Sequence, residues 1–516
     1  MHTTTLCETA HSALFDYIES EQSRHSLAAT STNALLAVLR HTDMELQVTA
    51  DACRLHEGLL RRLVGLCEHA QARLPGRIRV HGPFNAVFRT DDAPAVASLV
   101  NAVVLAHDAT NGVATLSRAL AEAEAAGATP PRVLGVSEGQ PPPGDPSLLH
   151  EWRTTARARI APAKFAQLLG RPAVAEHIVD LRIIGVAMRP AAIRALQAAP
   201  QLQTLQLDKC AIGAGPGASE LGNLVAKLTD LRSLSLAWNN LLDVGVVNVV
   251  RMLSRDNIAS LDVRCNSFGR AGCLQIANLL WPSHMRSLCL AGNPIWVDEP
   301  VRGGSFGTWN KCSREQLASY LEDGIWYTGL ERLDLSMTGT KMSDLLPGDT
   351  CPESALRALD LSSNDLRDDG ARAIARALSE DDSGLKHTLE VLRLGRNAIG
   401  GCGTAALASA LRNNTTLREL SLAQNQIGHR GAGELGALLA CNSALQVLDV
   451  RSCGFGDKGT KKLVQGVQAQ QRLGERSRLR RLDVSGNEFG WAREAALAEL
   501  SGTLQVVGLE GGGVAA

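Results

Sequence analysis

The sequence contains few aromatic residues. Seven Trp, three Tyr and eight Phe are spread over 516 residues, whereas hydrophobic residues of all kinds make up 45% of the chain. The apolar side chains are therefore mainly those of Leu, Ala, Val and Ile. This content excludes a disordered chain, because it is enough to bury a core, and the lack of rings argues against a nucleic-acid platform of stacked aromatics. The composition favours a helical or repeat architecture.

A strong net charge and a long apolar run are also missing. The chain has 52 Lys and Arg against 53 Asp and Glu, a formal net charge of −1, which argues against a general affinity for DNA, RNA or anionic membranes. Its apolar runs are far shorter than the ~20 residues that a membrane span needs. Residues 1–20 contain no Lys or Arg and carry Glu8, Asp16 and Glu19, which fits neither a secretory signal nor a transit peptide.

Motifs for metal binding and catalysis are scarce. The twelve cysteines include no C-x-x-C pair, which favours free thiols in a reducing compartment, the cytosol or the nucleus. Of these two we expect a cytoplasmic location. There is no zinc-type Cys/His spacing and no Walker A pattern. Residues Gly303 to Gly307 match G-x-S-x-G, but a nucleophile elbow needs a preceding strand in an α/β-hydrolase order. We therefore expect a flexible loop there, with no catalytic residue, metal or cofactor in the chain.

One phrase, L-x-x-L-x-L-x-x-N/C-x-I/L/F, recurs over the second two thirds of the chain. Its spacing is mostly 27–29 residues, and Leu504 begins a truncated copy while Ile178 begins a degenerate one. The ten main copies begin at Leu202, Leu231, Ile258, Met285, Leu330, Leu356, Leu389, Leu417, Leu445 and Leu479. The alternating leucines predict a short strand. The Asn or Cys predicts a turn in which its side chain satisfies buried backbone groups, and the remainder of each repeat is predicted to be a helix. A single such unit cannot bury its own core, so the units must stack.

Long repeats of this kind resemble the ribonuclease-inhibitor-type leucine-rich repeats, over about residues 175–510. The resemblance implies an α/β fold: a curved solenoid with a concave parallel sheet and outer helices, and a core that is aliphatic by construction.

The residues before the repeats carry no family motif. We predict a mainly helical N-terminal domain at 1–128, with helices at 45–74, 94–108 and 112–126 and a hairpin that pairs 77–80 with 86–88. Prolines between 129 and 146 indicate a linker, and 147–177 are expected to form a helical cap. The solenoid then occupies 178–516.

The middle residue of each predicted strand should face the concave side. These residues are Gln206, Ser235, Asp262, Cys289, Asp334, Asp360, Arg393, Ser421, Asp449, Asp483 and Gly508. Because neighbouring parallel strands lie about 4.8 Å apart, Asp334 should lie beside Asp360 and Asp449 beside Asp483. Four arginines are predicted to project nearby and to neutralise them: Arg264, Arg393, Arg396 and Arg451. The pattern indicates a mixed-charge groove for a protein partner, although L-D-L with solvated carboxylates is also common in such repeats.

The spacing of 45 residues between Met285 and Leu330 indicates an insertion at about 296–327. It contains a third of the aromatic residues: Trp296, Phe306, Trp309, Tyr320, Trp326 and Tyr327. Insertions in solenoids often lie on a binding face, and Trp and Tyr are common interface anchors. Alternatively, the rings form a private core that holds the insertion to the repeats. A predicted helix at 313–321 with Ser313 as its N-cap favours this alternative.

These features indicate a non-catalytic protein-interaction module, or a scaffold subunit of a larger assembly. An inhibitor of a basic nuclease would need an acidic concave face, which the near-zero charge disfavours. One alternative is a GTPase-activating protein similar to the Ran activators, although the acidic region that follows the repeats in those proteins is missing. Another is a structural subunit of the ciliary or flagellar axoneme, a cytoskeletal assembly. The partners are expected to be proteins, with neither membrane nor nucleic acid involved.

Overall fold

The structure is a computed structural model that describes residues 178–280, 284–296, 313–326, 328–341, 354–472, 478–487 and 504–507. It also describes the backbone of four short strands between residues 45 and 137. The chain divides into two compact units, Met1–Asn239 and Asn240–Ala516.

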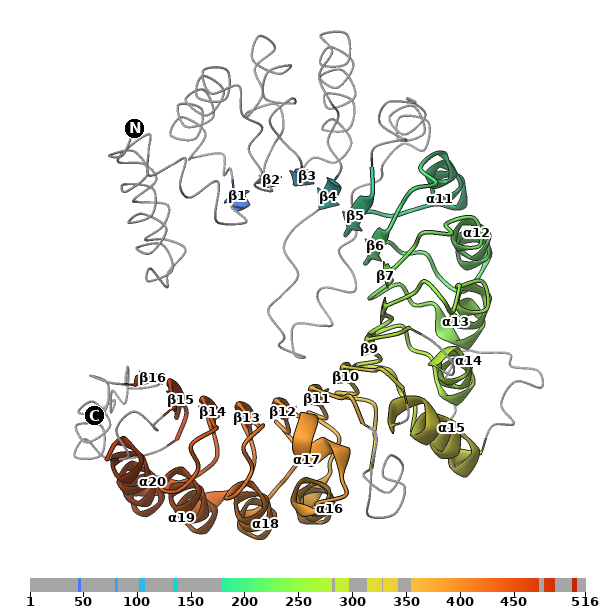
Figure 1. Ribbon diagram of the computed structural model, residues 1–516. Helices are drawn as coiled ribbons and strands as arrows, with labels where there is room; N and C mark the ends of the chain where they lie inside the picture. Colours follow the sequence, from blue (N-terminus) through green and yellow to red (C-terminus); the bar gives the residue numbers. More distant parts are fainter. Residues whose placement is uncertain are drawn as a thin grey trace, which may run out of the picture. The chain divides into compact units, whose positions relative to one another are not determined.

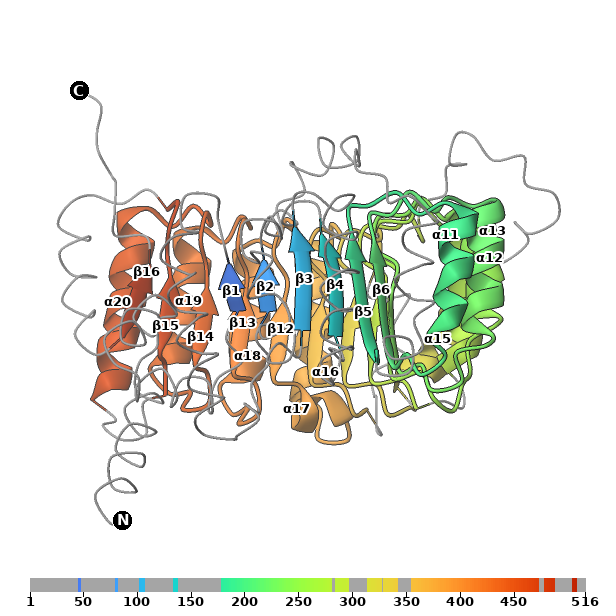
Figure 2. The same cartoon turned by 90° about the horizontal axis from the view of Figure 1, so that it is seen from above.

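In the first unit, seven parallel strands pair in chain order. They are β1 (Glu45–Gln47), β2 (Arg79–His81), β3 (Ala102–Ala106), β4 (Val133–Ser137), β5 (Asp180–Ile184), β6 (Thr204–Asp208) and β7 (Ser233–Ser235). Figure 2 shows β3 to β6 side by side with their arrows in one direction. Three helical segments connect the last of these strands: α11 (Pro190–Ala195), the 3-10 turn η2 (Leu196–Ala198) and α12 (Pro216–Val225).

In the second unit, parallel strands again follow chain order. They are β8 (Ser260–Asp262), β9 (Ser287–Cys289), β10 (Arg332–Asp334), β11 (Ala358–Asp360), β12 (Val391–Arg393), β13 (Glu419–Ser421), β14 (Val447–Asp449), β15 (Arg481–Asp483) and β16 (Gln505–Val507). Their helices are α13 (Leu242–Val250), α14 (Arg270–Leu280), α15 (Arg314–Trp326), α16 (Arg367–Ser379), α17 (Gly384–Thr388), α18 (Gly401–Leu411), α19 (Gly428–Leu439) and α20 (Gly456–Gln471). Within this unit, the helices lie on one side of the strands (Figure 1).

The core lies between strands and helices and is aliphatic. The central leucine of each described repeat strand is buried, while the residues on either side of it point away from the helices. Along the helices, alternating small and large residues such as Ala371, Ile374 and Leu378 form the buried face. The confirmed fold class is therefore an α/β leucine-rich repeat solenoid.

Buried asparagines join each repeat to the next at the carboxyl ends of the strands. The side-chain oxygen of Asn364 accepts a hydrogen bond from the backbone N–H of Thr338 at 3.0 Å. Its side-chain nitrogen donates to the backbone carbonyls of Leu335 and Leu361 at 2.8 and 3.0 Å. Where a repeat has cysteine instead, the thiol donates to the preceding repeat; Cys453 Sγ lies 3.2 Å from the Leu422 carbonyl oxygen. The Asn or Cys of the repeat motif thus forms hydrogen bonds with backbone groups that have no access to water.

Several expectations for the N-terminal third were wrong. Strand β1 lies inside the helix predicted at 45–74, β3 inside the helix at 94–108, and β4 inside the proposed linker at 129–146. Strand β2 falls near the predicted 77–80 strand but pairs in parallel with β1 and β3; residues 86–88 and the helix at 112–126 lie outside the described part. The domain boundaries at 128, 146 and 177 stay predictions.

The reason is that these strands keep only part of the repeat phrase. The register pairs Leu134 with Leu181, so β4 continues the sheet in the register of the repeat strands. However, Pro131 and Gly139 stand where the phrase has leucine and Asn or Cys. Two alternating apolar residues, without the first leucine and the Asn or Cys of the repeat motif, do not distinguish a strand from part of a helix. Of the helices within the described ranges, none has the length and apolar content to cross a membrane.

Candidate functional site

The candidate site is the open face of the sheet in the second unit, defined as the face of β8 to β15 that carries none of the described helices (Figure 1). The predicted register is confirmed, since Asp334 pairs with Asp360 and Asp449 with Asp483. The open face also includes the residue before each central leucine, for example Arg332 or Glu419. Its charges therefore form more than one row.

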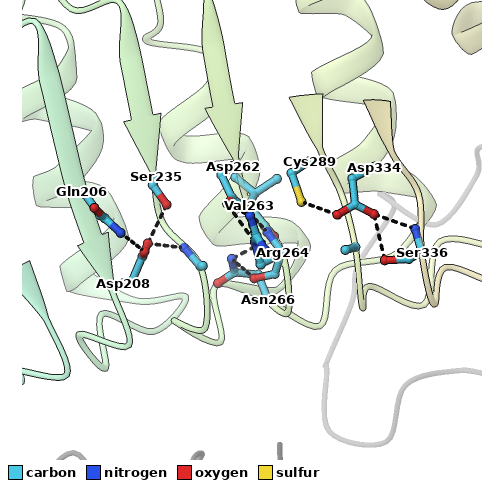
Figure 3. A network of polar contacts seen from close by, with 12 residues as sticks. Gln206, Asp208, Ser235, Asp262, Val263, Arg264, Asn266, Cys289, Asp334 and Ser336 are labelled. Atoms are coloured by element: carbon cyan, nitrogen blue, oxygen red, sulfur yellow. Dashed lines mark hydrogen bonds and ion pairs between the residues drawn. The ribbon is translucent and has the colours of Figure 1, made fainter. Parts of the chain in front are cut away.

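Asp262 on β8 is neutralised by Arg264, two residues further along the chain. The Arg264 guanidinium donates to Asp262 through Nη2 at 2.5 Å and Nε at 2.8 Å (Figure 3). Burial lowers the pKa of Arg264, but the hydrogen bond and the charge of Asp262 outweigh it, so that the pKa is raised overall. Asp262 and Arg264 thus form an ion pair within one strand end.

Cys289 on β9 lies between Asp262 and Asp334 in the register. Burial, followed by the charges of the two aspartates, raises the pKa of its thiol well above the ordinary value. The neutral thiol donates to Asp334 Oδ2 at 3.3 Å, and Ser336 donates to Asp334 Oδ1 through its N–H at 3.0 Å and its hydroxyl at 2.8 Å (Figure 3). Asp334 is thus held in place by neutral donors.

Asp360 on β11 has a similar environment. Its Oδ1 accepts the N–H of Ser362 at 2.9 Å. Burial and the neighbouring Asp334 raise the pKa of Asp360, while Ser362 and, more weakly, Arg393 lower it. Within the described part of the chain, neither Asp334 nor Asp360 forms an ion pair.

The remaining carboxylates of the open face have arginine partners. Arg393 pairs with Glu419 at 2.8 Å, Arg451 with Asp449 at 3.2 Å and Arg481 with Asp483 at 3.9 Å. Ser421 also donates to Asp449 at 2.9 Å.

Of the four predicted arginines, Arg451 forms an ion pair with Asp449. Asp334 and Asp360 form no ion pair with the described residues, but Arg264 interacts electrostatically with Asp334 and Arg393 with Asp360. Arg393 turns to Glu419, and Arg396 donates to Gln424. The sequence reasoning missed Glu419 and Arg481 because it considered only the middle residue of each strand. The period-two alternation places the preceding residue on the same face.

In the first unit, the corresponding polar residues satisfy one another. Asp208 accepts the Ser235 hydroxyl at 2.6 Å, the Ala237 N–H at 2.9 Å and the Gln206 amide at 2.5 Å (Figure 3). Asp180 pairs with Arg182 at 2.7 Å. This face has polar side chains with their hydrogen-bond partners already in place.

Two of the three described aromatic residues of the insertion, Trp296 and Trp326, belong to the core. Trp296 is 3% exposed and Trp326 1% exposed, and the Arg314 guanidinium lies 5.2 Å from the centroid of the Trp296 ring. The prediction that these two tryptophans are surface anchors was therefore wrong, because both side chains are buried. Tyr320, on the same helix, is 51% exposed. Phe306, Trp309 and Tyr327 lie outside the described residues.

The predicted helix with Ser313 as its N-cap is confirmed by α15. Ser313 Oγ accepts the Gln316 N–H at 3.2 Å, and Gln316 Oε1 accepts the Ser313 N–H at 3.1 Å, which is a capping box. Helix α15 packs beside α14 as the ordinary helix of its repeat. Without residues 297–312, which lie outside the described part, the repeat would have 29 residues, like its neighbours. The insertion is therefore shorter than 296–327.

Nothing in the described ranges indicates catalysis by a metal. They contain no group of three or more His, Cys, Asp or Glu residues that could hold an ion. The G-x-S-x-G segment at 303–307 lies outside them.

The repeats, their parallel sheet and their ladder of buried asparagines define a class: non-globular α/β solenoids of stacked repeats. A family model described as "Leucine Rich repeat" matches residues 227–250, 355–375, 413–436 and 441–464. The chain is 30% identical over 222 residues to the ribonuclease inhibitor of Sus scrofa. That match covers 42% of this chain and 44% of the pig protein, so it spans less than half of that relative. The chain thus contains leucine-rich repeats, and they are similar to those of the ribonuclease inhibitors.

Two solved structures are also similar. An internalin from Listeria monocytogenes is 17% identical with a TM-score of 0.34, over 83% of this chain and 97% of that one. A tropomodulin C-terminal domain from Caenorhabditis elegans is 18% identical with a TM-score of 0.24, over 28% of this chain and 84% of that one. With TM-scores this low, neither structure contributes to the assignment of a function.

Proposed function

We propose that the protein is a non-catalytic interaction module that binds a protein partner with the open face of its sheet. One observation carries the proposal. Among the described strands β8 to β15, six carboxylates lie on the open face, and four of them are in ion pairs with arginines. The other two, Asp334 and Asp360, are register neighbours that form no ion pair with the described residues.

This arrangement suits binding for two physical reasons. First, the paired arginines and the serine-bound aspartates are held in position by short strands, so little side-chain freedom remains to be lost on association. Secondly, a fixed pattern of charges selects partners, because juxtaposed like charges cost several kcal/mol whereas complementary ones speed association. Burial has already removed part of the hydration of Asp360, which makes a partner's cation more effective there.

A charge-insertion experiment on the full-length protein tests the proposal. Val391 and Val447 are half-buried on the open face, and the variant Val391→Arg/Val447→Arg should obstruct it. The matched control places the same charges on the helical side, at exposed Ser409 and Gln465, as Ser409→Arg/Gln465→Arg. Thermal melts by circular dichroism check that both variants fold.

Each protein is immobilised and the proteins that it captures from cell extract are quantified by mass spectrometry. We expect a set of captured proteins that the open-face variant loses and the helical-side variant retains. If both variants capture the same proteins as the unmodified chain, the open face is not the binding surface.

The more specific roles stay predictions: a scaffold subunit, a Ran-type GTPase-activating protein, an axonemal subunit and a cytoplasmic location. A GTP hydrolysis assay with Ran that shows no stimulation would eliminate the second of these.

A further inference from the structure

The outer side of helix α20 is basic. Its inner side is buried, and from residue 458 onward the exposed positions follow the helical period, which places them together on the outer side. These exposed residues are Lys458, Lys461, Lys462, Gln465 and, at the carboxyl-terminal cap, Arg472. Between residues 456 and 481 the sequence contains eight Lys and Arg but only two Asp and Glu, although the net charge of the whole chain is −1. Positive charge is thus concentrated in this helix and directly after it.

The cations of α20 have no carboxylate partner among the described residues. Neither the three lysines nor Arg472 forms an ion pair there. Glu434, on the neighbouring helix α19, pairs instead with Arg412 of α18 at 3.7 Å. Within α20 the single carboxylate is Asp457, which precedes the lysines. Four cations therefore face solvent beside one carboxylate of the same helix.

The positions of two lysines strengthen the positive potential. Lys458 lies in the first turn of α20, where the backbone N–H groups already carry partial positive charge and where an acidic side chain would stabilise the helix. Lys462 lies against α19, which packs beside α20 (Figure 1). A Cβ on Gly433 of α19 would be 2.8 Å from Lys462 Cδ and 3.1 Å from its Nζ, so the glycine leaves room for this lysine. The basic surface therefore reaches the boundary between the two helices.

The chemistry of this surface favours an acidic polypeptide over a nucleic acid. Neither α19 nor α20 contains Trp, Tyr or Phe, so the bases of a single strand would find no ring on which to stack. Lys458 and Arg472 are separated by about 21 Å along the helix axis, at 1.5 Å per residue. An extended segment of about six or seven residues spans that length.

We infer that Lys458, Lys461, Lys462 and Arg472 form a second docking surface, the basic stripe, which binds an extended acidic segment of a protein partner. The basic stripe lies on the helical side of the repeats, so the inference does not depend on the open face. Complementary charges steer association and select the partner. Because exposed charges are screened by salt, the affinity must fall as the ionic strength rises.

Fluorescence anisotropy with the full-length protein tests the basic stripe. The probe is a fluorescein-labelled peptide of about fourteen residues in which Glu alternates with Ser, and the comparison peptide has Gln in place of Glu. We expect only the Glu peptide to bind, with an affinity that falls about ten-fold or more between low and physiological salt. The variant Gln465→Arg adds a cation within the stripe and should strengthen binding by about two-fold or more.

Two triple variants with the same net charge provide the matched comparison. The first, Lys458→Gln/Lys461→Gln/Lys462→Gln, removes the lysines of the basic stripe. The second, Arg367→Gln/Arg372→Gln/Arg412→Gln, removes exposed arginines of α16 and α18 that pair with carboxylates. We expect about ten-fold weaker binding of the Glu peptide for the first and less than about two-fold change for the second. Thermal melts by circular dichroism check that both variants fold.

Several results would overturn the inference: no preference for the Glu peptide over the Gln peptide, equal losses in the two triple variants, or an affinity that salt leaves unchanged. Tighter binding of a single-stranded DNA of about fourteen nucleotides than of the Glu peptide, lost in the lysine variant, would also overturn it. The stripe would then bind the phosphates of a nucleic acid. None of these results bears on the open face, which Val391→Arg/Val447→Arg tests separately.

Discussion

Asn397 provides a quantitative test of the asparagine ladder. Its side chain is fully buried at the carboxyl end of β12. The amide oxygen accepts the N–H groups of Asn364 at 2.9 Å and Leu366 at 3.3 Å, and the amide nitrogen donates to the carbonyls of Leu361 at 2.9 Å and Gly395 at 3.3 Å. Asn397→Ala removes all four hydrogen bonds and leaves backbone groups of two repeats buried without partners.

The expected loss can be estimated from these bonds. Two of them are short and two are long, and each is worth about 0.5–1.5 kcal/mol net. Because the abandoned backbone groups stay buried, we expect Asn397→Ala to lower the free energy of unfolding by about 2–4 kcal/mol. Asn397→Cys should cost roughly half as much, since a thiol already occupies this position in another repeat, where Cys453 donates to the Leu422 carbonyl.

Urea denaturation followed by circular dichroism measures the free energy, and hydrogen exchange localises the effect. The amides of Asn364 and Leu366 should exchange faster in Asn397→Ala than in the unmodified protein, while amides of the first unit should not change. Equal stability of the alanine and unmodified proteins, within about 0.5 kcal/mol, would refute the reasoning. Alanine and cysteine variants of equal stability would refute the role assigned to the thiol.

Three further predictions concern helix packing, pH and thiol reactivity. A Cβ on Gly466 would lie 2.1 Å from a backbone carbonyl oxygen of α19, so Gly466→Ala should destabilise by about 1–3 kcal/mol in urea denaturation; the control Gly433→Ala meets only the flexible end of a lysine side chain and should be neutral or stabilising. The folded-state pKa of Asp360 is raised, first by burial and then by its acidic neighbour, so its stabilising effect is present below the unfolded-state pKa and is lost as the pH rises through the folded-state pKa. We therefore expect the free energy of unfolding of Asp360→Asn, minus that of the unmodified protein, to be larger at pH 7 than in acid. A difference that does not vary with pH would contradict this. Burial raises the pKa of Cys453 to about 12, so peptide mapping after alkylation should find it unmodified while exposed Cys441 is labelled; similar labelling of the two would contradict the buried position.

Much of the second unit followed from the spacing of leucines. The register that places Asp334 beside Asp360 was predictable, because each repeat contributes one strand and stacking aligns equivalent positions. The helix that begins after Ser313 was predictable from its capping box. Both depend on interactions within one repeat or between adjacent copies of the same phrase.

The pairing of charges was not predictable in this way. Arg393 could pair with Asp360 on one neighbouring strand or with Glu419 on the other, and the structure has the second. The choice depends on side-chain torsions and on which residues share a face. Because each exposed ion pair contributes little free energy, small differences in distance decide between the two partners. The burial of Trp296 and Trp326 similarly depends on how α15 packs on its repeat.

The sequence by itself determined that this protein is a leucine-rich repeat solenoid, that its core is aliphatic, and which residues occupy equivalent places in successive repeats. These properties are periodic, and a period can be counted along a chain. Only the tertiary structure decided that strands β1 to β4 extend the sheet before the recognisable repeats, that two tryptophans are buried, and which carboxylates of the open face form ion pairs with arginines. These depend on contacts between residues far apart in the chain, whose energies differ too little for the pattern alone to rank them.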